Sequence, residues 1–124
     1  MSVKVELGEL ATRLGDFDVA YLVTVSEDAR AHVLSVWPEL AGDAIVVSGV
    51  GRHTQANAAA RPEVTLVFPP REAGGYTLLV DGTADVDGST VTVAPVKAIL
   101  HRPAAGPDGG RAGSDCVDVP VTTA

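Results

Sequence analysis

Several residue types are scarce in this sequence. It has one cysteine, Cys116, two lysines, Lys4 and Lys97, and 4% aromatic residues in a chain of 124. A single cysteine excludes an internal disulfide and a cysteine-based zinc site, and it suits a reducing compartment. No apolar run approaches the ~20 residues of a membrane helix, and the first residues lack the basic-then-apolar pattern of a signal peptide. We therefore expect a cytoplasmic protein with no membrane partner.

Positive charge is also scarce. Sixteen acidic residues against nine basic ones give a formal net charge of −7. This balance argues against a nucleic-acid binder, because a basic face supplies most of the affinity in such proteins. Most of the positive charge is arginine, which suits bidentate contact with phosphate or carboxylate groups. The position of each arginine is therefore informative about a ligand.

The composition fits one domain with a single core, since 46% of the residues are hydrophobic. We expect this domain to span residues 1–103. Residues 104–113 are rich in alanine, glycine and proline, which is typical of a flexible linker. The end of the chain, residues 115–121, is apolar enough to dock as a C-terminal arm.

The hydrophobic pattern indicates a mainly β fold. Residues 3–14 have apolar positions at helical spacing and predict an amphipathic helix. Six β-rich runs follow, at 19–25, 31–38, 44–48, 64–68, 76–86 and 90–100, with short turns at 27–30 and 40–43 and a second short helix at 54–60. Pro95 should mark a bulge or a sheet edge, since proline has no backbone N–H to donate a hydrogen bond to a neighbouring strand. We predict a closed or nearly closed six-stranded antiparallel barrel with two short helices.

The segment 48–62, SGVGRHTQANAAARP, has the composition of an anion-binding loop. Its two glycines let the backbone approach a ligand, the helix that begins near Thr54 offers unpaired N–H groups, and Arg52 adds a formal charge. A phosphate group suits such a site. An ordinary loop, with Thr54 as a helix N-cap and Arg52 in solvent, is the alternative.

With this order of elements, the sequence resembles the pyridoxamine 5′-phosphate oxidase-like flavin-binding split barrels. The resemblance spans residues 19–103 and is carried by AYLVTV, HVLSV, GRHTQANAAARPEVTL and YTLLVDGTADV. It implies a six-stranded split barrel and a homodimer that holds a flavin between its subunits. The implied cofactor-binding residues are Gly51, Arg52, His53, Thr54 and Asn57 at the phosphate, the backbone of Val33, Leu34, Ser35 and Val36 along the ring, and His101 and Arg102 from the partner.

The resemblance implies an FMN-binding oxidoreductase that transfers hydride or electrons to a small organic acceptor. The chain lacks the extra arginines, the lysines and the C-terminal segment with which the founding oxidase holds its substrate, which argues against pyridoxamine phosphate. No catalytic residue can be assigned by this route.

Alternatives remain open at this stage. One is a deazaflavin-dependent reductase, although the acidic composition favours FMN over a cofactor with a poly-glutamyl tail. Another is a non-catalytic protein that binds a flavin or a haem product, with His32, His53 and His101 as candidate haem ligands. Trp37 could stack on a flavin ring, or lie in the core or at a dimer interface. No metal motif and no paired acid/base set stands out, which disfavours hydrolysis and metal chemistry.

Overall fold

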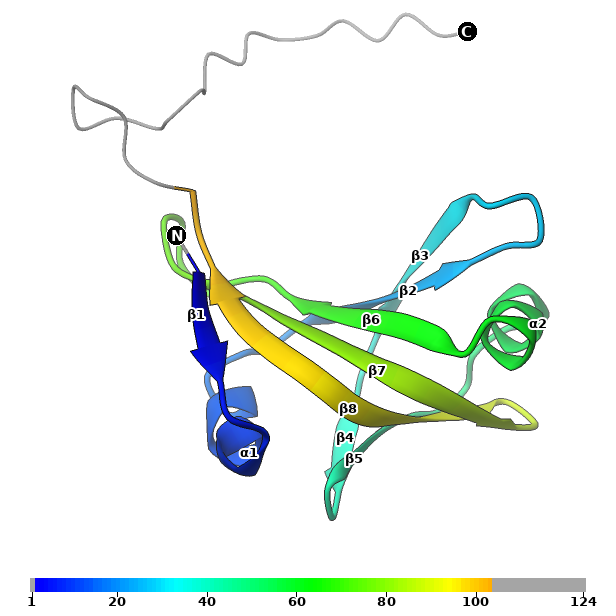
Figure 1. Ribbon diagram of the computed structural model, residues 1–124, viewed down its shortest axis with the longest axis horizontal. Coiled ribbons are helices and arrows are strands. Elements are labelled where there is room, and N and C mark those ends of the chain that lie inside the picture. Colours follow the sequence, from blue (N-terminus) through cyan, green and yellow to red (C-terminus); the bar gives the residue numbers. More distant parts are fainter. Residues whose placement is uncertain (1, 104–124) are drawn as a thin grey trace, which may run out of the picture.

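The computed structural model describes residues 2–103, so the expected linker, the C-terminal arm and Cys116 lie outside the described residues. Eight strands and two short helices make up this part, with one 3-10 turn (Figure 1). The strands are β1 (Ser2–Val5), β2 (Ala20–Val25), β3 (Ala31–Val36), β4 (Glu39–Ala41), β5 (Ala44–Val47), β6 (Glu63–Phe68), β7 (Thr77–Asp87) and β8 (Thr90–His101). The helices are α1 (Leu10–Leu14), which follows the 3-10 turn η1 (Leu7–Glu9), and α2 (Arg52–Ala60).

All strands belong to one antiparallel sheet with the order β3-β2-β6-β7-β8-β5-β4, and β1 pairs with β8 beside this path. The sheet curls around its core without closing, because β3 and β4 remain its two ends. This is the predicted mainly β split-barrel architecture, with eight strands in place of six.

The core is formed by side chains that alternate between buried and exposed positions along the strands. In β2, Ala20, Leu22 and Thr24 are buried while the residues between them are not, and β6 and β7 repeat the pattern. Alternate residues of a strand point to opposite faces, so one face of the sheet is buried and the other is partly exposed. The fully buried side chains are aliphatic with few exceptions, among them Leu22, Ile45, Leu66 and Leu78.

The predicted irregularity at Pro95 is confirmed. The register between β7 and β8 shifts where Asp81 pairs with Lys97 and Gly82 with Pro95, which leaves Val96 as the extra residue of a bulge. A Cβ at Gly82 would lie 2.5 Å from Cγ1 of Val93, so only glycine fits this crossing. At the same point β8 changes partner on its other edge, from β5 to β1.

Three sequence predictions differ from the structure. Residues 3–14 do not form one helix, because residues 2–5 form β1 against the end of β8, and only five residues, Leu10–Leu14, are α-helical. Residues 39–41, placed partly in a turn, form the short strand β4. The second helix also begins two residues earlier than predicted, at Arg52.

None of the helices within residues 2–103 has the length and apolar character needed to cross a membrane.

Candidate functional site

The anion-binding loop predicted from the sequence leads from β5 into α2. Gly49 has φ +74°, a conformation that favours glycine. The N–H of Val50 donates to the carbonyl of Ser89 at 3.0 Å, which ties the loop to the β7–β8 turn. Gly51 is the N-cap residue in an extended conformation and provides no side chain to cap the helix. The loop therefore holds the beginning of α2 open to a ligand.

The first turn of α2 offers three backbone donors. The first hydrogen bond within the helix runs from the N–H of Gln55 to the carbonyl of Gly51 at 3.0 Å. The N–H groups of Arg52, His53 and Thr54 precede it, and no side chain caps them. Such N–H groups, together with the positive end of the helix dipole, favour an anion.

Thr54 is the third residue of α2 and not its N-cap, which rules out the alternative role suggested for it. Its side chain is only 2% exposed. Within residues 2–103 its hydroxyl makes no hydrogen bond, and neither does the exposed guanidinium of Arg52. Thr54 is therefore a nearly buried residue in the same turn as the unpaired N–H groups. A hydroxyl without a partner in the protein can donate to a ligand.

α2 is fixed to the barrel by two polar contacts. Nδ2 of Asn57 donates to Oγ1 of Thr24 at 3.2 Å, and both side chains are buried. Nε of Arg61, just past the helix, donates to the carbonyl of Val25 at 2.7 Å. Asn57, predicted to bind the cofactor, thus has a structural partner in β2. The two contacts set the position of the helix start relative to β2 and β3.

A hollow of about 320 Å³ lies beside α2 at the β2–β3 turn. We call it the histidine hollow; it is lined by Ser26, Arg30, Ala31, His32, His53 and Asn57. The ring centroids of His32 and His53 are 6.4 Å apart with the planes tilted by 50°. The hairpin register places His32 opposite Thr24, and α2 brings His53 to it from 21 positions along the chain. Sequence reasoning did not foresee this hollow, because it depends on how α2 packs.

The strand predicted to follow the flavin ring, β3, is an edge strand. It pairs only with β2, so its other edge is free to bind a ligand or a second chain. Val33 is 57% exposed, Ser35 is exposed, Leu34 is half-buried and Val36 is buried. The one printed approach between β3 and α2 is that of the His32 and His53 rings, so residues 33–36 begin one position after the residue that lies near the start of α2.

His101 and Arg102 are not part of this assembly within one subunit. They lie at the end of β8, on the opposite side of the barrel from α2 (Figure 1). Nδ1 of His101 is 3.1 Å from Oγ of Ser2, and the guanidinium of Arg102 stacks 4.4 Å above the ring of Tyr76. Within one subunit, these residues are therefore remote from the segments predicted to bind the flavin.

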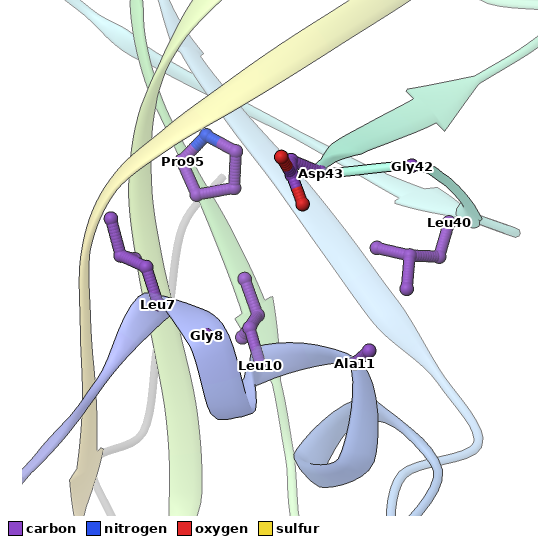
Figure 2. A pocket seen from close by; sticks show the side chains of 8 residues that line it. All are labelled: Leu7, Gly8, Leu10, Ala11, Leu40, Gly42, Asp43 and Pro95. Atoms are coloured by element: carbon purple, nitrogen blue, oxygen red, sulfur yellow. The ribbon is translucent and has the colours of Figure 1, made fainter.

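A second hollow of about 320 Å³ lies between η1, α1 and the β4–β5 turn (Figure 2). Leu7, Leu10, Leu40 and Pro95 give it an apolar wall, and the carboxylate of Asp43 lies at its edge. It is remote from the start of α2 and contains no predicted site residue.

Trp37 lies between β3 and β4 and is 82% exposed, so the suggestion that it is a core residue was wrong.

No group of three or more metal-ligating side chains is assembled within residues 2–103. The histidines of this part are His32 and His53, which form a pair, and His101, which is remote from them. The candidate site is therefore organised around backbone N–H groups, a hydroxyl and cationic side chains, which suits an anionic organic cofactor.

The chain is similar in sequence to two curated mycobacterial proteins. It is 40% identical over 130 aligned residues to protein Mb0449c of Mycobacterium bovis and protein MT0457 of Mycobacterium tuberculosis, both described as uncharacterized. The alignments cover 92% of this chain and 91% of each relative. No protein-family model matches the sequence.

Solved structures share the fold at low sequence identity. An FAD-binding protein from Mycobacterium smegmatis has a TM-score of 0.60 and 15% identity, with 82% of this chain and 100% of that one covered. A protein described as a putative pyridoxamine 5′-phosphate oxidase from Listeria innocua has a TM-score of 0.58 and 16% identity, over 76% and 96% of the chains. An F420 reductase has a TM-score of 0.58 and 15% identity, over 67% and 89%.

Proposed function

The chain belongs to the family of the two mycobacterial proteins and has the pyridoxamine 5′-phosphate oxidase-like split-barrel fold, and from this premise we propose that it is a flavin-dependent oxidoreductase. Its cofactor is FMN, its acceptor is a small organic molecule, and it works in the cytoplasm as a homodimer. The named flavin- and F420-associated proteins of the same fold support a flavin-type cofactor.

The observation that carries the proposal is the first turn of α2. Three backbone N–H groups and the exposed Arg52 side chain have no partner within the described residues, and the nearly buried Thr54, whose hydroxyl also has none, lies in the same turn of the helix. A phosphate dianion satisfies several of these donors at once and is favoured by the helix dipole. Gly49 and Gly51 leave room for the phosphate, because a Cβ at either position would meet nothing within 4 Å.

The free edge of β3 suits the isoalloxazine ring. With the phosphate at His53, the chain from His32 to Val36 extends about 13 Å at ~3.3 Å per residue, which is enough for a linker and a ring. Backbone N–H groups along this edge can orient the ring and favour negative charge on it. The bound flavin supplies the redox chemistry by accepting and passing on a hydride or electrons.

A homodimer suits the outer face of the sheet. The register places Tyr21, Val67, Leu79 and Ile99 in one row across β2, β6, β7 and β8, on the face opposite the core. Tyr21 is 38% exposed and the other three are half-buried. An apolar row across four strands is typical of a surface that packs against another protein. A site that combines His101 and Arg102 with β3 would need such a second copy, because these residues are remote from β3 within one chain.

The proposal is tested on the purified protein by absorption spectroscopy and by titration with FMN. We expect the protein to be yellow as purified or to bind added FMN with a change in the flavin spectrum. The bound flavin should then be bleached by NADH or NADPH and reoxidised by an added quinone or nitro compound. Bound flavin without turnover across a broad acceptor panel would make the protein a flavin carrier, and failure to bind any flavin would refute the proposal.

A further inference from the structure

The hollow beside α1 has no role in the function proposed so far, and a second hollow adjoins it. The first, of about 320 Å³, has Leu7 and Leu10 on one side and Leu40 and Asp43 on the other (Figure 2). The second, of about 130 Å³, lies between the end of α1 and the beginning of β4, and Leu40 lines both. We call the two hollows together the α1 cleft. It shares no residue with the phosphate site at α2 or with the ring segment 33–36.

The walls of the α1 cleft are apolar and partly aromatic. Phe17 and Phe68 line the smaller hollow, with ring centroids 6.0 Å apart and planes tilted by 60°. Trp37 lines the same hollow and is largely exposed, although tryptophan is highly buried on average. Leu7 and Leu40 are exposed in the larger hollow. Large apolar side chains left exposed around one cleft are typical of a site that binds an apolar group.

The charged side chains that line the α1 cleft are all acidic. They are Asp18, Glu39 and Asp43. Oδ1 of Asp18 is 3.0 Å from Nε of Arg71, so this carboxylate is paired. Glu39 begins β4, Asp43 lies in the β4–β5 turn, and both are exposed without an ion pair or a side-chain hydrogen bond within residues 2–103. Two unpaired carboxylates beside apolar and aromatic walls favour a ligand that is both apolar and cationic.

We propose that the α1 cleft is a binding site for a small organic cation with an aromatic body. The aromatic ring packs against the apolar walls at Leu40, which lines both hollows, and Glu39 and Asp43 balance the charge. Trp37 offers its indole face to the cation. The volume of the larger hollow falls within the range of about 300–1,000 Å³ that small-molecule sites occupy. This inference goes beyond the proposed flavin site and does not depend on it.

Charge argues against two other occupants of the α1 cleft. The C-terminal arm, residues 115–121, contains Asp115 and Asp118, which the carboxylates of the cleft repel. A second copy of the chain carries the same net charge of −7, and like charges across an interface oppose association. A small cation meets neither obstacle.

The test uses Trp37, the only tryptophan of the chain, as a fluorescent reporter. The purified protein, without added flavin, is titrated with benzyltrimethylammonium, benzyl alcohol and benzoate, which share one aromatic ring and differ in charge. We expect the cation to bind at least about tenfold more tightly than the alcohol, which corresponds to ~1.4 kcal/mol, and benzoate to give no saturable change. Equal affinities for the cation and the alcohol, or no saturable change with the cation, would overturn the inference while the proposed function stands.

Two matched double variants locate the effect. In Glu39→Gln/Asp43→Asn we expect the advantage of the cation over the alcohol to fall to about threefold or less, with an unchanged thermal midpoint because both side chains are exposed. Glu27→Gln/Asp87→Asn removes the same charge from hairpin ends near α2, remote from α1, and should preserve the advantage (Figure 1). An advantage that survives the first variant, or falls equally in both, would refute a site in the cleft. Dissociation of the proposed dimer by Leu7→Arg would also refute it, since a second copy would then cover the cleft.

Discussion

The polar pair Asn57–Thr24 links the site to the barrel at the scale of single residues. Thr24 is fully buried in a strand whose other inward residues are aliphatic, and its hydroxyl is matched by the Asn57 side chain. An alanine-rich helix has little apolar surface with which to fix its rotation, so a specific hydrogen bond sets which residues face the ligand. The pair therefore determines where the Thr54 hydroxyl and the free N–H groups lie.

We predict that Asn57→Ala lowers the free energy of unfolding by about 1–3 kcal/mol, since it leaves the buried Thr24 hydroxyl without a partner. Urea denaturation measures this change. Thr24→Val is the matched second variant, and the double variant should cost clearly less than the sum of the two single variants. Strictly additive effects would show that the two side chains do not depend on each other.

At the scale of elements, the local sequence pattern predicted most of the strands and α2. The strands follow from alternating apolar and polar residues, and α2 follows from a short alanine-rich run between glycine and proline. β1 was missed for a physical reason. It contains one buried residue, Val5, so its alternation is invisible, and its pairing partner in β8 lies more than 90 residues away. β4 is three exposed residues long and has no pattern to detect. In the candidate site, Arg52 and Thr54 could be predicted from the loop sequence. The approach of His32 to His53 could not, because it depends on how α2 packs against the barrel.

The role of β1 can be tested by comparing its two valines. Val5 is buried and Val3 is partly exposed. We expect Val5→Ala to lower the free energy of unfolding by about 1.5–3 kcal/mol, through lost burial of two methyl groups and the space left behind, and Val3→Ala to lower it by less than about 0.5 kcal/mol. Thermal and urea denaturation provide the values. Equal effects at the two positions would contradict the strand assignment.

At the scale of the whole molecule, the open sheet leaves two features that one subunit does not use. One is the free edge of β3, and the other is the apolar row formed by Tyr21, Val67, Leu79 and Ile99 on the outer face. The ends of β8 and of β3 are remote from each other within a subunit. A site that uses both therefore requires two chains, which makes the oligomeric state part of the functional account.

We predict that Tyr21→Arg converts the proposed dimer into a monomer, because it places a charge in the apolar row. Sedimentation velocity gives the mass, and circular dichroism should show an unchanged β content. Leu7→Arg, at a similarly exposed apolar residue beside α1, should leave the dimer intact. A wild-type monomer, or a Tyr21→Arg dimer of wild-type affinity, would disprove this interface.

The most direct measurement of the central claim compares FMN with riboflavin, which lacks the phosphate, by isothermal titration calorimetry on the apo-protein. The account predicts that wild-type protein binds FMN at least about 100-fold more tightly than riboflavin, and that Arg52→Gln/Thr54→Val loses most of this difference while its affinity for riboflavin is unchanged. Arg13→Gln serves as the matched charge control. Equal affinities of the wild-type protein for the two flavins, or a full phosphate advantage in the double variant, would contradict the account.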